Sequence, residues 1–401
     1  MNLTTEHVEL LASCDLDSKR FVSSFEPKKC RLTNLDSLET LFITPFAKDQ
    51  ITYIDASLNL LTDVPPSIHS FSRVISLNLS DNTIREWPSP VNGLTSLLKL
   101  NINNNFLDSI GDLRALTQLS ILNLSSNTIT SLCSLTNHLL IPTNLEELNI
   151  SYNLMNTLPS SINTLTTLQV LDARCNSLTE LPLRFHYLKH LHKLFLSNNK
   201  LKTIPLVLIS ALAFNDVNNH KYLDLSHNEI EEFEEPVINT NTNRRHVTPS
   251  PAKAPLSLNL SHNKITKLPN TLTRFNSVVE LDLSHNKIQL LPQNLGAMKR
   301  LHTLMLSANP LNELPVEIGK CTALENLTVN LTPLRDLPDS IVFLTALTNL
   351  QLLDNSMPLK AFAFHGNTIA SYRLRYLVEK KRALIANPLR SLPYEIREKI
   401  Y

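Results

Sequence analysis

Three histidines occupy the same position in a repeated phrase of the sequence, and residues of this type at this spacing could bind a metal ion. His227, His262 and His285 each precede an Asn in the tetrapeptide LSHN. Imidazoles stacked on neighbouring strands could bind a metal ion. No Cys or carboxylate completes a ligand set beside them in the phrase. We therefore interpret them as a column of solvated histidines, and we expect neither a metal nor another cofactor.

Catalytic motifs are absent from the sequence. It contains no P-loop, no GxSxG, no HExxH and no kinase signature. Only five of its 401 residues are glycine, so loops that could cradle a phosphate are scarce. The sequence therefore argues against an enzyme.

Two kinds of modification site match simple rules. Thr248 and Ser250 each precede Pro and lie near Arg244 and Arg245, within a segment at 236–255 that has no apolar period. This segment is predicted to be a flexible insert loop, and the two residues are candidates for proline-directed phosphorylation, with an unregulated loop as the alternative. N-glycosylation sequons also occur, but they follow from the consensus sequence of the repeat, and we expect no glycosylation. They begin at Asn78, Asn123, Asn149, Asn259, Asn326 and Asn330.

Composition narrows the classes of partner and the compartment. There are 37 basic and 36 acidic residues, so charge gives no argument for a nucleic-acid or membrane-surface partner. The five cysteines are scattered, which predicts neither disulfides nor a zinc site. Acidic residues interrupt the apolar residues of the first segment, and no run of about 18 apolar residues could form a membrane span. These features predict a cytoplasmic protein that is not secreted, with the nucleus as the alternative compartment.

One phrase recurs along most of the chain. Residues 258–269 read LNLSHNKITKLP, 281–292 read LDLSHNKIQLLP and 304–315 read LMLSANPLNELP, each shifted by 23 residues. Thr332 takes the place of the central Asn in one copy, and Cys30 does so in a possible first copy, giving about fourteen units. The other units are anchored at Asn59, Asn82, Asn105, Asn127, Asn153, Asn176, Asn199, Asn228, Asn263, Asn286, Asn309 and Asn355.

Positions in each unit are numbered here from this anchor. Apolar residues at −5 and −3 alternate with polar ones and predict a short strand. Apolar residues follow at +2 and +5, then usually Pro at +6, where regular pairing should end. Further apolar residues at +9 and +12 suit either a helical turn or an extended return segment. One unit cannot bury these columns alone, so units must stack, with the anchor amide turned inward to satisfy buried backbone groups of its own and adjacent coils.

The consensus LxxLxLxxNxLxxLPxxIxxLxx resembles the 23-residue leucine-rich repeat, and within it the intracellular repeat proteins of the Ras-pathway scaffold group and their plant Ras-group relatives. The resemblance covers about 22–357. It implies an α/β solenoid, a horseshoe with about fourteen parallel strands on the concave face. It also implies binding of proteins, commonly small GTPases or phosphatases. We expect helical end caps at 1–25 and 358–401, the latter with a basic helix near 370–383.

Side chains at −6, −4, −2 and −1 should line the concave face. Ser at −2 and Asn or Asp at −4 are interpreted as filler residues of a strand edge. Exceptions to these columns are candidate partner-binding residues, because exposed aromatic and Arg side chains favour binding hot spots; the alternative is drift on a tolerant face. They are Lys99, Glu147, Tyr152, Arg174, Lys193, Phe195 and Tyr222.

These observations predict a non-enzymatic scaffold or adaptor that binds a folded protein on its concave face. The alternative function is a structural subunit of a large assembly, which would contact its neighbours through edges and the convex face.

Overall fold

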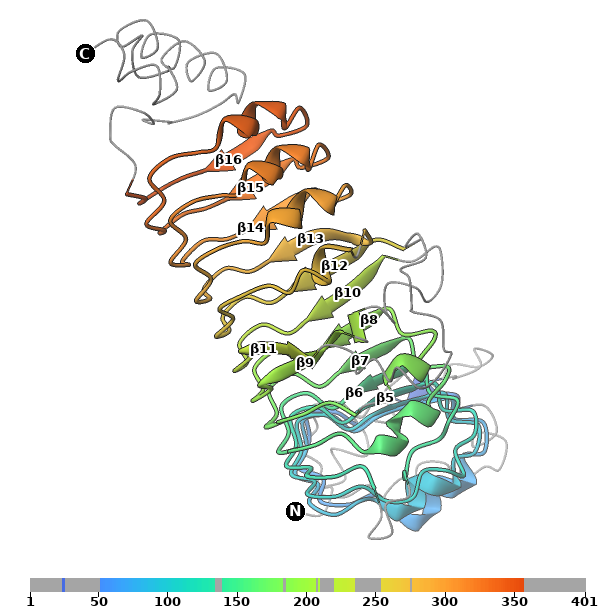
Figure 1. Cartoon of the computed structure of the whole chain (residues 1–401). Helices are drawn as coiled ribbons and strands as arrows, with labels where there is room; N and C mark the ends of the chain where they lie inside the picture. Colours follow the sequence, from blue (N-terminus) through green and yellow to red (C-terminus); the bar gives the residue numbers. More distant parts are fainter. Residues whose placement is uncertain are drawn as a thin grey trace, which may run out of the picture. The chain divides into compact units, whose positions relative to one another are not determined.

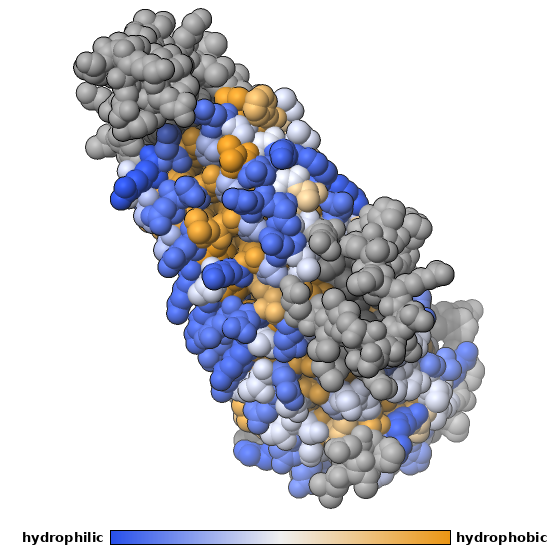
Figure 2. Space-filling model, in the orientation of Figure 1, coloured by the Kyte–Doolittle hydropathy of each residue, from blue (hydrophilic) through white to orange (hydrophobic). Residues whose placement is uncertain are grey.

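The computed structural model describes residues 24–25, 51–133, 139–182, 185–206, 208–209, 220–234, 254–274 and 276–356. The chain divides into two compact units, the first ending at Lys264 and the second beginning at Ile265. Each unit is a stack of similar coils (Figure 1). On the face that Figure 2 shows, apolar side chains lie among hydrophilic ones. Within the described ranges, no helix has the length and apolar content needed to cross a bilayer.

Parallel strands, one per coil, form the sheet of each unit (Figure 1). In the first unit the strands are β1 Ser24–Phe25, β2 Tyr53–Asp55, β3 Ser76–Asn78, β4 Lys99–Asn101, β5 Ile121–Asn123, β6 Glu147–Asn149, β7 Val170–Asp172, β8 Lys193–Phe195, β10 Lys221–Asp224 and β12 Leu256–Asn259. In the second they are β13 Val278–Asp282, β14 Thr303–Met305, β15 Asn326–Thr328 and β16 Asn349–Gln351. The described strands confirm the predicted solenoid with about fourteen parallel strands.

The strand register follows the apolar column at −5. Leu77 pairs with Leu100, Leu100 with Leu122, and Leu122 with Leu148, although the sequence spacing changes from 23 to 22 to 26 residues. Their side chains are each 1% exposed. Burial of each contributes about 1.5–3 kcal/mol. The register is therefore held by the core, and the irregular spacings are absorbed outside the strands.

Short 3-10 helices form the return segments of many coils. They are η1 Pro66–Ser70, η2 Ser89–Gly93, η3 Ser160–Thr164 and η4 Phe185–Tyr187 in the first unit, and η5 Leu272–Arg274, η6 Gln293–Ala297, η7 Val316–Lys320 and η8 Asp339–Phe343 in the second. Six of them follow a +6 Pro that acts as N-cap, for example Pro159 before η3. A Pro suits this place because an N–H there needs no helical partner. Of the two alternatives for the +9 and +12 columns, the helical turn is the one observed.

A further pair of strands was not predicted. β9 Thr203–Pro205 and β11 Glu232–Glu234 form a separate two-stranded parallel sheet, with Phe233 opposite Ile204. They occupy positions +4 to +6 of their coils, so these two coils pair a second time, after the anchor, and this pairing ends at Pro205. Pro205 is tolerated because it is the last residue of its strand.

The expected N-terminal helix is wrong at Ser24–Phe25. These residues form β1, in which Ser24 pairs with Tyr53 and Phe25 with Ile54. The pairing spans 29 residues, the same spacing that places Cys30 in the anchor position before Asn59. Pairing with β2 satisfies backbone groups that a sheet edge would leave open. The remainder of both expected caps, the basic helix, Thr248 and Ser250 lie outside the described residues, as do 236–253 of the expected insert.

Candidate functional site

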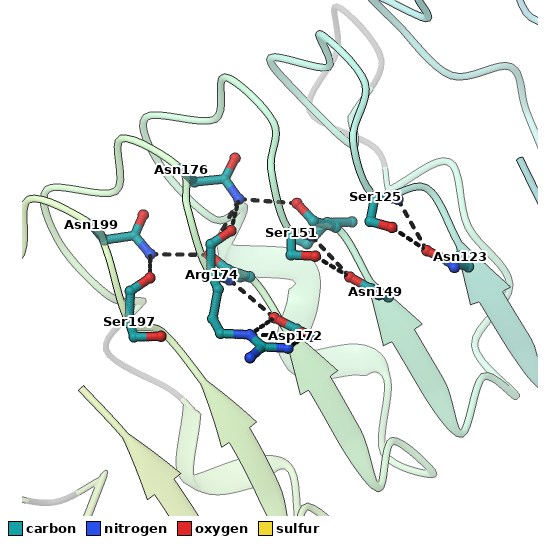
Figure 3. Close-up of polar contacts among 11 residues, drawn as sticks. Asn123, Ser125, Asn149, Ser151, Asp172, Arg174, Asn176, Ser197 and Asn199 are labelled. Carbon is teal, nitrogen blue, oxygen red and sulfur yellow. Dashed lines mark hydrogen bonds and ion pairs between the residues drawn. The ribbon is translucent and has the colours of Figure 1, made fainter. Parts of the chain in front are cut away.

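Anchor side chains connect each coil to the one before it. The Nδ2 of Asn82 donates to the carbonyl oxygens of Ala56, Leu79 and Ser80 at 3.0, 3.0 and 3.1 Å, and its Oδ1 accepts the N–H of Leu61 at 3.0 Å. Figure 3 shows the corresponding Nδ2 bonds of Asn176 and Asn199 to backbone carbonyls of their own and the preceding coil. Four backbone groups that water cannot reach are thus paired by one amide. The same four-bond set recurs at Asn105, Asn127, Asn153, Asn176, Asn199, Asn228, Asn263 and Asn309.

Thr332 departs from this arrangement. Its hydroxyl and its N–H both donate to Oδ1 of Asn355, at 2.7 and 2.9 Å. Asn355 Nδ2 donates to the Val329 carbonyl at 2.7 Å. A hydroxyl is too short and has too few donors to reproduce the amide's bonds. The coil at Thr332 is therefore joined mainly by the Asn of the next coil.

The Ser and Asn/Asp columns are not the filler residues that the sequence suggested, because their side chains form hydrogen bonds where each strand ends. Asn149 Oδ1 accepts the backbone N–H of Ser151 at 3.0 Å and its hydroxyl at 2.7 Å (Figure 3). Asp224 and Ser226 repeat this pair, at 3.1 and 2.7 Å. The −4 side chain thus closes an Asx turn as the strand ends. Sequence reasoning could have found this turn from the joint recurrence of Asn or Asp at −4 with Ser two residues later.

After this turn the backbone at −1 is left-handed. Thirteen non-Gly residues have positive φ in the described ranges, and all of them occupy −1, including Tyr152, His227 and Leu331 at φ 54, 52 and 55°. Such a conformation is unfavourable for most L residues. The turn is accordingly held from both sides, by the Asx bond before it and the anchor amide after it.

Three of the candidate residues contact one another: Arg174, which follows β7, Phe195 on β8 and Tyr222 on β10. Arg174 Nε donates to Asp172 Oδ1 at 3.0 Å and Nη2 donates to Oδ2 at 2.6 Å (Figure 3). This pair raises the pKa of Arg174. The guanidinium carbon lies 5.0 Å from the centre of the Phe195 ring. Phe195 in turn meets Tyr222, with centroids 5.4 Å apart and planes tilted by 46°. We call Arg174, Phe195 and Tyr222 the planar stack.

The other candidates surround the planar stack at different distances. Exposed Lys193 is paired with Tyr222 in the sheet, and exposed Glu147 lies two strands away on β6. Tyr152 is 60% exposed in the left-handed turn, and a hydrogen bond with Cys175 raises the pKa of its hydroxyl. Lys99 is on β4, four strands from Lys193, or about 19 Å at the usual strand spacing. The structure does not bring Lys99 to the stack.

Two rings of the His column are stacked. The rings of His227 and His262 are 4.1 Å apart and 10° from parallel. Lone pairs of parallel rings do not converge on one ion. In the described part of the chain no group of three or more His, Cys, Asp or Glu residues could hold a metal.

Known proteins match both the repeats and the fold. Models of "Leucine Rich repeats (2 copies)" and "Leucine Rich Repeat" match residues 166–208 and 277–298. A solved leucine-rich repeat protein of Leptospira interrogans is 31% identical, with a TM-score of 0.68, and the match covers 82% of this chain and 78% of that one. The leucine-rich repeat ectodomain of the receptor kinase GASSHO1/SCHENGEN3 from Arabidopsis thaliana is 23% identical, with a TM-score of 0.54 and coverage of 79% and 40%. At that identity it shows the fold alone.

Two curated proteins are similar over shorter stretches. Adenylate cyclase of Schizosaccharomyces pombe is 32% identical over 207 residues, which are 46% of this chain and 12% of the cyclase. Human oligodendrocyte-myelin glycoprotein is 30% identical over 160 residues, which are 39% of this chain and 35% of the glycoprotein. The chain therefore spans only a small part of the first protein and about a third of the second.

Proposed function

Because this chain belongs to the leucine-rich repeat family, we propose that it is a non-enzymatic scaffold or adaptor that binds a folded protein on the strand face of its first unit. Leucine-rich repeat proteins generally mediate protein–protein interaction, and this supports the class of function. The small share of the cyclase that matches gives no reason to transfer its activity to this chain.

The planar stack is the observation that carries the proposal. Phe195 occupies −4, where the neighbouring coils have Asp172 and Asp224, whose carboxylates accept the N–H of the residue two places later. A phenyl ring cannot accept that bond, so it does not help its coil to fold in this way. Arg174 likewise replaces the Ser that closes the turn elsewhere. Aromatic and Arg side chains gathered on a rigid sheet are typical of binding hot spots.

We propose further that the partner is a signalling protein. The resemblance of its repeats to those of Ras-pathway scaffolds supports a small GTPase or a phosphatase as the partner class. A cytoplasmic setting is proposed with it. Cys133, Cys175 and Cys321 are free thiols in the structure, which agrees with a reducing compartment.

Capture from native lysate tests the proposal, with bound proteins identified by cross-linking mass spectrometry. Phe195→Asp should reduce capture of the partner about tenfold or more, since a hot-spot side chain contributes about 2 kcal/mol. The melting temperature should hardly change, because Asp is the residue of both flanking coils. Thr328→Asp is the matched control: it makes a similar change at the same −4 position of β15 in the second unit.

Undiminished capture by Phe195→Asp would overturn the planar stack as the binding site. If instead a whole co-sedimenting complex were retained regardless of this substitution, the structural-subunit alternative would be supported.

A further inference from the structure

We propose that the planar stack is a preformed, charge-balanced platform for an uncharged apolar or aromatic side chain of the partner, and that Asp172 is the residue that positions it. Arg174 on this proposal is not a receptor for a partner carboxylate or phosphate. The inference rests on the proposed function and names the chemistry of the group that binds there.

The guanidinium of Arg174 is already engaged by a carboxylate of its own coil. Asp172 accepts from both Nε and Nη2, and its Oδ1 also accepts the Arg174 backbone N–H at 3.1 Å. The Asp172 side chain is only 9% exposed, whereas that of Arg174 is 43% exposed. A bidentate pair of this kind is the strong form of a charge-assisted hydrogen bond. A partner anion would have to compete with an internal carboxylate that is held in place and largely shielded from water.

Contacts with the Phe195 ring link the ordered guanidinium of Arg174 to the side chain of Tyr222. The guanidinium lies over one face of Phe195, and Tyr222 contacts the same ring. Each contact restricts side-chain rotation before any partner arrives. Such preorganisation lowers the entropic cost of binding. What the stack offers is a set of ordered planar surfaces, which suit an apolar or aromatic side chain better than an isolated charge.

Charges around the stack cancel. Asp172 and Asp224 flank Phe195 in the sheet register, and Arg174 and Lys193 supply two positive charges against them. Burial lowers the pKa of nearby His192 and so disfavours the charged form of this imidazole. A balanced surface exerts little long-range attraction on a charged group.

Neighbouring coils provide the variants for a test. Asn149 holds the −4 position one strand before Asp172 and makes the same turn bond, so Asp172→Asn keeps the fold and removes the carboxylate. Asp224→Asn is the matched control. It removes a negative charge on the other side of Phe195, but its turn partner is Ser226 and not an arginine.

Binding of the protein whose capture depends on Phe195 is then measured for both variants. Asp172→Asn should weaken it about threefold to tenfold, because the guanidinium is released from the ring, and Asp224→Asn should change it less than about twofold. Affinity should also change less than about threefold between about 0.05 and 0.5 M NaCl. Tighter binding by Asp172→Asn, or a loss of affinity with salt of more than about tenfold, would show that Arg174 receives an anion and would overturn the inference.

A second measurement needs no partner. The side-chain Nε–H of Arg174 should give a slowly exchanging NMR resonance in the wild type that is lost in Asp172→Asn and kept in Asp224→Asn. A resonance unchanged in Asp172→Asn would refute the positioning role. Failure of the proposed function is distinct, because it would appear as capture that does not depend on Phe195.

Discussion

Beside the backbone hydrogen bonds of the sheet, a single amide side chain makes polar bonds between one coil and the next. In the coils with the full four-bond set, the anchor Asn lies where the strand has ended and the backbone turns. The groups it reaches are buried carbonyls of two coils and the N–H at +2 of the previous coil. A side chain with both a donor and an acceptor at its tip is needed for this. Residue-scale predictions follow from that chemistry.

Asn309→Ala should cost about 1–3 kcal/mol of unfolding free energy, because three carbonyls and the Ile288 N–H lose their partner. Thr332→Ala should cost about 1 kcal/mol or less, since it loses only one hydroxyl bond to Asn355. Denaturant unfolding of the two variants measures the difference. Equal losses would contradict the role assigned to the amide.

Leu331→Asn should stabilise the protein by up to about 1 kcal/mol, because Asn tolerates the left-handed backbone better than Leu. The Leu331 side chain is 57% exposed and its φ is 55°, so little packing is lost. Leu290→Asn is the control: it is 59% exposed but lacks a positive φ, and no gain is expected. Thermal unfolding that moved both variants equally would show that backbone conformation is not the cause.

At the scale of elements, the 3-10 turns of the second unit pack closely on one another. A Cβ added to Gly319 in η7 would overlap the carbonyl oxygen of Ser340 in η8, and one added to Gly296 in η6 would lie 2.6 Å from the carbonyl oxygen of Glu317. The two glycines are therefore needed for close approach of neighbouring turns, not for an unusual φ.

Gly319→Ala should destabilise the protein by about 1–3 kcal/mol through this overlap with backbone. Gly93→Ala should cost less, because the nearest atom to its new Cβ is the His69 side-chain Cβ at 2.9 Å. Comparison of the two denaturation midpoints tests the idea. A larger loss for Gly93→Ala would mean that the turns of η7 and η8 can separate at little cost.

On the scale of the whole molecule, stability is built from contacts between neighbouring coils. The strand pairs and the anchor amides both join a coil to the one beside it. Such repeat proteins open locally, and their stability approximates a sum of nearest-neighbour terms. A destabilising substitution in one coil should therefore lower the stability of that coil and its neighbours more than that of distant coils.

Amide hydrogen exchange should reveal this in the Asn309→Ala variant. Exchange should accelerate first within about 283–334, the coils that Asn309 and its neighbours join, and residues 77–105 of the first unit should keep their wild-type protection. Mass spectrometry of exchanged peptides measures both. A uniform acceleration along the chain would show that unfolding is global and not coil by coil.

The sequence by itself determined the period, the position of nearly every strand and the identity of the anchors. These are properties of a local pattern: alternate apolar residues must face a core, and a Pro after the second apolar pair suits the start of a 3-10 turn. One copy of the phrase predicts its own coil, and the copies predict the stack. The family resemblance rests on the same residues.

Only the tertiary structure decided how side chains from different coils meet. Ser24–Phe25 proved to be a strand rather than a helix, because it pairs with β2 of the neighbouring coil. The same holds for Arg174. Its type and spacing predicted an exposed cation, but the sheet places it between Asp172 and Phe195, where its charge is paired and its flat face lies on a ring. Spacing along one chain specifies which residues can face a partner. The packing of the folded side chains specifies which of their charges and hydrogen-bonding groups remain available to that partner.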